Sequence, residues 1–261
     1  SIFDDRGSFA RSFVLEAPGH PFLFPRGVLG DRMLLVSVVQ TVAPGEVKSG
    51  ATRDTVVYLR YDLDRALVDP IGRFAGDELF LRVDDHGMSV WSLPFGVRAA
   101  MATHGPGFFY GTSDRYEIGR YSADGALEML IRRAVEPRPV TQADVDAYKQ
   151  RLLSARYGRD RQEVERLVAD IPFPETMPLF SELRVDAEGN LWVEEYRRPG
   201  DRQPRWTIFD STGQMLGTIE ISERFTIFEI GKDYVLGRWT DNFDIEFVRL
   251  YGLIKPTSAP R

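Results

Sequence analysis

RVDAEGNLWVEEY, residues 184–196, contains two alternating apolar runs that flank the residues DAEGN. Carboxylates around a glycine raise the question of a calcium loop. An EF-hand loop places its glycine sixth and a carboxylate twelfth, whereas here, counted from Asp186, glycine is fourth and the twelfth residue is Arg197. The spacing suits a short turn that closes a β-hairpin through a positive-φ residue. We therefore predict a hairpin and not a calcium site.

The same pattern recurs along the chain. An aromatic residue or Val is followed by Asp or Ser and, four positions after the aromatic, by Gly, in FDDRG (3–7), VDDHG (83–87), YSADG (121–125), VDAEG (185–189) and FDSTG (209–213), with a degenerate copy in YDLDR (61–65). The flanking residues are β-branched or aromatic and alternate with the two-residue period of a strand. The shortest spacing between equivalent aromatics, Phe209 to Tyr251, is about that of one four-stranded propeller blade.

These repeats predict an all-β fold, a β-propeller of four-stranded antiparallel blades in a single domain spanning residues 1–261. We expect about four blades plus a hairpin, as in an incomplete six-bladed ring. The expected parts are an outer hairpin at 1–15, blades at 24–71, 97–134 and 179–221, a three-stranded blade at 225–253, an extra hairpin from 80–83 and 89–93, and a polar tail at 255–261.

Whether the blades form a closed ring depends on how the two ends of the chain pair. An open arc would leave unpaired strand edges, which invite self-association. We therefore expect an open arc that can associate through its blade edges. The alternative is a closed four-bladed ring in which 9–15 pairs with 246–253.

One segment departs from the β pattern. Residues 141–169 show helical spacing, for example at Tyr148 and Leu152. Thr141 with Asp144 three residues later resembles a capping box with Asp in place of Glu. We predict an αα insertion between two blades. Its apolar stripe either packs onto the propeller or is kept for a partner or a lid.

Composition limits the classes of function. The chain has 261 residues, 43% hydrophobic and 12% aromatic, as expected of a folded protein with a sizeable core. A net charge of −6 and a pI of about 5.3 argue against a nucleic-acid partner. An arginine cluster is offset by neighbouring acids, so we interpret it as a solvated hairpin tip; it comprises Arg197, Arg198, Arg202 and Arg205 beside Glu194, Glu195 and Asp201.

Several kinds of site and segment have no sequence signal. The chain contains no cysteine, which removes disulfides, thiolate zinc sites and cysteine nucleophiles but does not settle the compartment. Apolar runs such as MLLVSVV (33–39) are too short to span a membrane. The first residues, SIFDDRGSF, already look like a hairpin in mid-domain, without a visible signal peptide. We expect a chain that lacks its first blades.

The hairpins SIFDDRGSFARSF, YEIGRYSADG followed by EPRPVTQADVDAY, and ELRVDAEGNLWVEEY leading to WTIFDSTGQMLG cover most of the chain. In these motifs the chain resembles the NHL-like six-bladed β-propeller proteins of environmental bacteria. The resemblance implies six blades, often behind an export signal, and therefore a periplasmic or extracellular location. Members of this group share no agreed catalytic motif, so the resemblance assigns no catalytic residue.

Motifs of known chemistry are absent. HxH, HExxH, GxSxG and GxGxxG do not occur, which argues against a histidine metal centre, a serine hydrolase and a phosphate cradle. Of the three histidines, His20 and His86 stand in turn-like sequences, whereas His104 follows an expected inner strand and is a candidate for a ligand-facing role. Asp241, Asp244 and Glu246 form either a polar loop or a cation site.

Propellers bind ligands on the face where inner strands begin and the loops between second and third strands gather. Besides His104, the weak candidates for this face are Arg98, Arg115, Glu182, Trp239 and Asp241. Mixed charge with an indole suits a small polar ligand or a peptide. We expect a non-catalytic binding or scaffold protein without a cofactor. The alternative is a propeller hydrolase or lactonase with one Ca²⁺ or other divalent cation in the channel.

Overall fold

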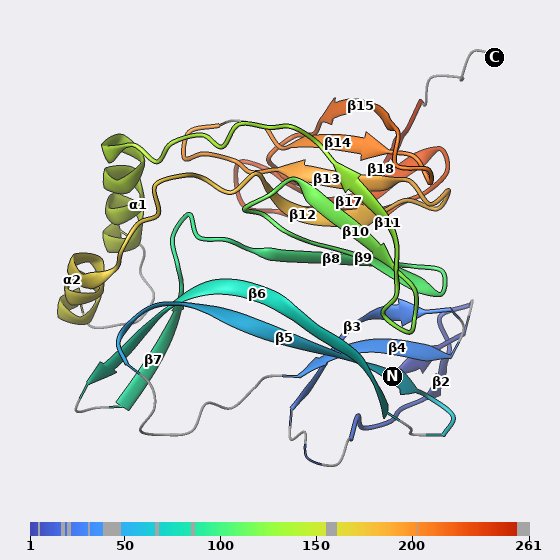
Figure 1. Ribbon diagram of the computed structural model, residues 1–261. Coiled ribbons are helices and arrows are strands. Elements are labelled where there is room, and N and C mark those ends of the chain that lie inside the picture. Colours follow the sequence, from blue (N-terminus) through green and yellow to red (C-terminus); the bar gives the residue numbers. More distant parts are fainter. Residues whose placement is uncertain are drawn as a thin grey trace.

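The computed structural model shows an almost all-β chain of antiparallel sheets that follow one another in sequence order (Figure 1). It describes residues 1–254 except 5, 17–18, 20–21, 31, 39–47, 66–67, 85–86, 155–160 and 202. The expected tail at 255–261 and the turn residues His20 and His86 lie outside these residues.

The described strands form a hairpin and four larger sheets, which we call the first to fourth blades. The hairpin pairs β1 (Ile2–Phe3) with β2 (Phe9–Arg11). The first blade contains β3 (Leu23–Leu29), β4 (Met33–Val38), β5 (Gly50–Asp62), β6 (Val68–Asp84) and β7 (Gly87–Ser92), and the second contains β8 (Ala99–His104), β9 (Gly107–Thr112), β10 (Glu117–Tyr121) and β11 (Leu127–Arg132). The third contains β12 (Phe180–Val185), β13 (Leu191–Glu195), β14 (Arg205–Phe209) and β15 (Met215–Glu220), and the fourth contains β16 (Phe225–Ile230), β17 (Tyr234–Thr240) and β18 (Glu246–Gly252).

The order of the strands is that of propeller blades. Within the second and third blades, each strand pairs with the next in sequence, and the first strand lies at one edge. These edge strands lie side by side, since β8 has β3 on one side and β12 on the other. Successive meanders with neighbouring first strands are the arrangement of a propeller. The all-β, four-stranded blade prediction is therefore confirmed as an incomplete propeller-like fold.

The hairpin turn at residues 186–190 explains why the repeated motif forms blades. One carboxylate oxygen of Asp186 accepts the backbone N–H groups of Glu188 and Asn190, both at 2.9 Å. The other accepts the indole N–H of Trp192 at 3.2 Å. Gly189 closes the turn with φ of +85°, where a side chain would be strained. The carboxylate thus holds a hairpin, as predicted.

The same turn occurs at four further places. In each one, the backbone N–H of the first residue bonds to the carbonyl of the fifth, and the fourth N–H bonds to the first carbonyl; the first residues are Asp4, Ser122, Asp210 and Asp241. The turn that begins at Asp241 was not recognised from the sequence because Asp244, with φ of +59°, replaces glycine. Asp241 is therefore a turn residue as well as a loop carboxylate, and accepts the N–H groups of Phe243 and Ile245.

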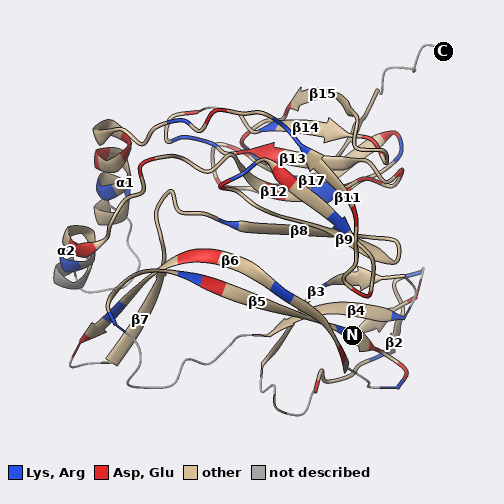
Figure 2. Cartoon of the chain, in the orientation of Figure 1, with Lys and Arg blue, Asp and Glu red and all other residues tan. Residues whose placement is uncertain are grey.

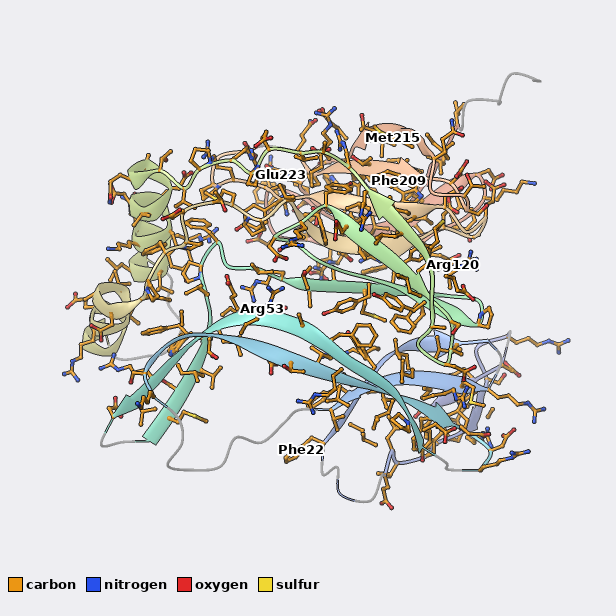
Figure 3. The ribbon with its side chains drawn as sticks, in the orientation of Figure 1. Phe22, Arg53, Arg120, Phe209, Met215 and Glu223 are labelled. Carbon is orange, nitrogen blue, oxygen red and sulfur yellow. The ribbon has the colours of Figure 1, made fainter. Side chains whose placement is uncertain are left out.

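Aromatic and aliphatic side chains fill the space between neighbouring blades, as Figure 3 shows for Phe209, which lies inside while Met215 lies outside. Phe209 packs against the second blade, and Trp192 and Trp206 pack against the fourth. Strand aromatics at equivalent positions of the repeat are predicted to fill this layer, and all three are at most 3% exposed. The same prediction for Tyr121 is wrong, because Tyr121 is only half-buried at the contact with the first blade.

The expected extra hairpin is not a separate element. Residues 80–83 are the end of β6, a strand of 17 residues that pairs with β5 from Val68 to Leu81 and with β7 from Leu79 to Asp84. We expected the first blade to end at residue 71 and the extra hairpin to begin at residue 80. Gly76 instead permits close approach, because a Cβ there would lie 2.9 Å from the carbonyl oxygen of Asp54. The first blade is therefore one five-stranded, curled sheet (Figure 1).

The two ends of the arc are not paired with each other. Among the described residues, β2 pairs with β1 alone and β18 with β17 alone. The pairing of 9–15 with 246–253 that a four-bladed ring requires is absent from them. Valine, leucine and aromatic side chains of β18 are exposed along this edge; they are Phe247, Val248, Leu250 and Tyr251. Self-association through the edges remains a prediction.

The predicted insertion consists of α1 (Gln142–Ser154) and α2 (Arg161–Asp170). The backbone N–H of Thr141 donates to the Asp144 carboxylate at 2.8 Å, which confirms the capping box. Leu152 and Ile171 pack against Phe80 and Leu93 of the first blade. The insertion therefore packs onto the blades, at the end of the long strands β5 and β6 (Figure 1).

Candidate functional site

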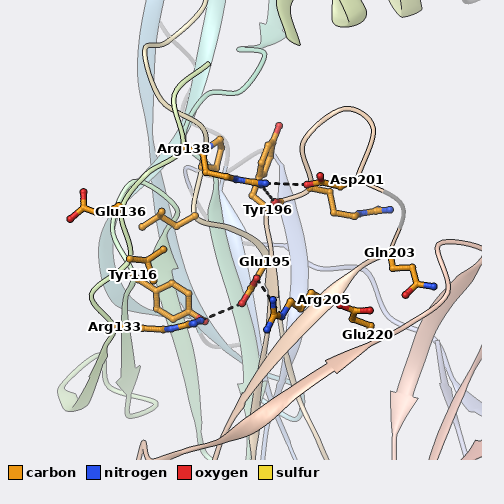
Figure 4. A pocket seen from close by; sticks show the side chains of 14 residues that line it. Tyr116, Arg133, Glu136, Arg138, Glu195, Tyr196, Asp201, Gln203, Arg205 and Glu220 are labelled. Atoms are coloured by element: carbon orange, nitrogen blue, oxygen red, sulfur yellow. Dashed lines mark hydrogen bonds and ion pairs between the residues drawn. The ribbon is translucent and has the colours of Figure 1, made fainter. Parts of the chain in front are cut away.

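A hollow of about 620 Å³ opens between the second and third blades, at the end where the inner strands begin. Its floor comes from the ends of β11, β13, β14 and β15, and its rim from the segment that leads to the insertion and from the loop between β13 and β14 (Figure 4). The charged and polar side chains that line it are Tyr116, Arg133, Glu136, Arg138, Glu195, Tyr196, Arg197, Asp201, Gln203, Arg205 and Glu220. Val135, Pro178 and Leu179 add an apolar wall.

Glu195 is the centre of the floor. One of its carboxylate oxygens accepts from the guanidinium of Arg133 at 3.3 Å and from the hydroxyl of Thr207 at 3.0 Å. Arg133 also donates to the Thr207 hydroxyl at 3.2 Å. The other oxygen lies 3.9 Å from Nε of Arg205, too far for a direct hydrogen bond. One side of this carboxylate is therefore saturated and the other is open.

Tyr116 supports the floor from below. Its side chain is 3% exposed, and the Arg133 guanidinium lies 5.6 Å from the centre of its ring. Burial raises the pKa of the Tyr116 hydroxyl to about 12, although the Thr207 and Arg133 side chains lower it. The phenol therefore stays protonated at neutral pH. Its ring fixes Arg133 by packing and cation–π attraction.

Two arginine–aspartate pairs hold the rim. Arg138, which precedes α1, donates to Asp201 at 3.2 Å and to the Tyr196 carbonyl at 2.5 Å. In the opposite direction, Arg198 of the loop lies 3.2 Å from Asp144 at the start of α1. Burial alone would raise the pKa of Asp144, but hydrogen bonds from Thr141 and the charge of Arg198 hold it below its usual value. The insertion therefore positions the loop at the hollow.

A second hollow of about 480 Å³ adjoins the first at Arg197. It lies between the third and fourth blades and contains the turn that begins at Asp241. Arg224 donates to the side-chain oxygen of Asn242 within it. Asp241, a ligand-binding candidate from the sequence, lines this second hollow. Its carboxylate already accepts a backbone N–H of the turn.

The other candidates from the sequence do not meet in one site. Arg98 forms an ion pair with Asp77 of β6 at 3.3 Å. Arg115 lines a separate hollow between the first and second blades. His104 lies at the far end of β8, where its Nε2 atom is next to the hairpin turn at Gly189. These three therefore stand at different places around the second blade.

The remaining candidates are engaged within their blades. Glu182 lies opposite Glu194 in the β12–β13 pair and forms a 2.6 Å ion pair with Arg184. Burial raises the pKa of Glu182, although Arg184 lowers it. The indole of Trp239 is covered by the guanidinium of Arg249, 3.6 Å from its ring. Neither Glu182 nor Trp239 lines any of the three hollows described above.

The residues of the first hollow were present in the sequence as the mixed-charge cluster, which we interpreted as a solvated hairpin tip. Arg197, Asp201 and Arg205 of that cluster line the hollow, together with Glu195. No sequence pattern indicated Arg133 or Tyr116 as site residues. They follow and precede strands of the second blade, and they reach the hollow only because the two blades pack together. Figure 2 shows basic and acidic residues interspersed over the second and third blades, without a stripe of one sign.

Within the described residues, no three or more His, Cys, Asp or Glu side chains group in a way that could hold a metal ion. Among the helices of the same residues, none combines the length and the apolar character needed to cross a membrane.

Comparison with known proteins gives likeness at the level of structure alone. No family model and no curated protein matches the chain. A crystal structure of the eukaryotic initiation factor matches with a TM-score of 0.38 and 9% identity over 91% of this chain and 54% of that chain. A prolyl endopeptidase matches with a TM-score of 0.35 and 10% identity over 85% and 31%. The AfRom2 CNH domain matches with a TM-score of 0.28 and 10% identity over 88% and 64%.

The chain thus spans about half the length of the initiation-factor chain and about a third of the prolyl endopeptidase chain. At these scores the three matches do not identify a function.

Proposed function

We propose that this protein is a non-catalytic binding propeller that takes a small polar ligand or a peptide in the hollow between its second and third blades. The observation that carries the proposal is the floor network, in which two blades contribute Arg133 and Glu195 to one fixed cluster. Positioned polar groups beside an apolar wall are the usual composition of a ligand site.

The rim adds to this support. A side chain held by two partners loses little further freedom when a ligand binds, which lowers the entropic cost of binding. Arg138 and Asp201 are held in this way, since each has a partner in addition to the other. The hollow is therefore preorganised on its floor and on its rim.

Further features of the proposal come from the resemblance to NHL-like propellers. These are a six-bladed ring, a bacterial source and an exported location, with a protein partner as a further kind of ligand. A scaffold role, in which the protein binds a partner protein and no small ligand, fits the same surface, because loops at this end of the blades project from rigid sheets.

The proposal is tested by a ligand-observed NMR screen with polar metabolites and tripeptides. Ligands of the hollow should lose at least tenfold in affinity for Arg205→Met, which keeps the aliphatic stem and removes the guanidinium. The matched control is Arg132→Met, because Arg132 is an exposed residue of the same end of the blades that pairs with Glu117 outside the hollow. Equal binding by both variants, or ligands that bind only elsewhere, would refute the proposal.

The alternative class, a hydrolase with one divalent cation, makes a different prediction. Purified protein would then retain a stoichiometric ion after dialysis. Elemental analysis of the dialysed protein, with hydrolysis of lactone substrates as the second readout, separates the two classes.

A further inference from the structure

The charges that line the hollow balance. Its four arginines are matched by three glutamates and one aspartate. A site of this kind exerts no net attraction on a ligand of one sign, because steering requires an excess of charge. An anion that paired with Arg133 would also have to displace Glu195, which already accepts from this guanidinium.

The groups that remain open are both donors and acceptors. The second oxygen of Glu195 has Arg205 at 3.9 Å, and Arg205 reaches the Thr218 hydroxyl only at 3.5 Å. Both contacts are long, so this guanidinium keeps hydrogen-bonding capacity. A polar gap longer than about 3.5 Å is one that a bridging oxygen can fill. A hydroxyl group fits there, since it can accept from Arg205 and donate to Glu195.

More groups of the same kind surround this gap. In Figure 4 Glu220 lies beside Arg205, and Gln203 lines the hollow at a greater distance from Arg205. Neither side chain has a hydrogen bond to another described residue. An amide offers both a donor and an acceptor, and a carboxylate accepts two or more hydroxyl protons. Val135 and Leu179 add apolar surface to the same hollow. A molecule with several adjacent hydroxyls on one side and C–H groups on the other matches this lining.

We propose that the ligand of this hollow is a neutral carbohydrate, recognised through adjacent hydroxyl groups by Arg205, Glu195 and Gln203. This inference rests on the proposed function and narrows it to one chemical class. It explains why the lining combines equal numbers of both charges and not an excess of one. Hydrogen bonds to charged side chains are the stronger kind, so neutral hydroxyls gain most where carboxylates and guanidinium groups alternate.

The inference is tested with a printed array of neutral oligosaccharides, followed by calorimetric titration of the strongest binder. Triglycine and citrate serve as the zwitterionic and anionic probes. We expect a neutral oligosaccharide to bind, Arg205→Met to weaken it about tenfold or more, and Arg132→Met to leave it unchanged. Affinity should stay constant between low and high salt, because a neutral ligand releases no counterions.

The outcomes separate this inference from the proposed function. If triglycine or citrate binds in an Arg205-dependent manner and no oligosaccharide does, the chemical class is wrong and the binding site stands. If an oligosaccharide binds equally to wild type and Arg205→Met, the site is wrong. If no probe of any class binds, neither the carbohydrate assignment nor a small-ligand role of the hollow survives.

Discussion

Replacing Asp186 by Ala should be among the most destabilising single changes outside the apolar core. The carboxylate is 2% exposed and accepts two backbone N–H groups, the Asn190 amide and the buried Trp192 indole. Each buried donor left unpaired costs about 1–3 kcal/mol. The Trp192 indole is 1% exposed, so water cannot easily replace its partner. Since the turn can partly relax, we expect a loss of about 3–5 kcal/mol in the free energy of unfolding.

The sister turn provides a matched control. Asp210 accepts the N–H groups of Thr212 and Gln214 with the same geometry, but it lies at a more exposed position. Water can satisfy these donors, so Asp210→Ala should cost only about 1 kcal/mol. The two variants differ in burial and not in the type of turn. Their difference therefore measures what burial and the two side-chain donors, Asn190 and Trp192, add to the same turn.

The assay is urea denaturation followed by tryptophan fluorescence and, independently, by far-UV circular dichroism. Trp192→Phe removes the indole N–H, so Asp186→Ala should cost about 1 kcal/mol less in that background. Equal losses for Asp186→Ala and Asp210→Ala would refute the reasoning, and so would a loss below 1 kcal/mol for Asp186→Ala. A change in the slope of the unfolding free energy against urea would show that the variant altered the compactness of the unfolded state or that its unfolding is not two-state.

Four further outcomes are expected. Trp206→Ala should cost about 3–5 kcal/mol in urea denaturation, because the ring is 3% exposed between the third and fourth blades; a loss under 1 kcal/mol would contradict this packing. Asp244→Gly should stabilise the protein by about 0.5–1 kcal/mol, since it relieves a φ of +59° in a non-glycine residue, and a lower melting temperature would be the contrary result. The pKa of Asp144 is lowered in the folded protein, so its contribution is present above the pKa of about 4 in the unfolded chain and is lost as the pH falls through the folded value; Asp144→Asn should flatten the acid limb of the melting curve, and an unchanged limb would show that other groups control it. Val248→Lys with Leu250→Lys should reduce self-association in sedimentation velocity, because charges on an exposed edge strand oppose strand pairing; wild-type protein that stays monomeric at high concentration would end the prediction of association through this edge.

The local elements of this protein follow from its sequence. The turn at residues 186–190 is determined by an Asp that accepts two backbone N–H groups and a Gly with positive φ, both within five residues. The capping box at Thr141 and Asp144 is similarly short-range. Alternation of apolar residues then places Trp192 and Trp206 on buried faces. These features depend on contacts between near neighbours, which the sequence order itself brings together.

Contacts between segments that are far apart in the sequence could be known only from the tertiary structure. The length of β6 could not be read from the sequence, because Gly76 looks like a break until β5 is placed against it. The hollow escaped prediction for the same reason. Arg133 and Glu195 are 62 positions apart and form a contact only after two blades stack. Charge alternation alone cannot distinguish a solvated hairpin tip from a binding site, since the difference lies in the wall that the neighbouring blade supplies.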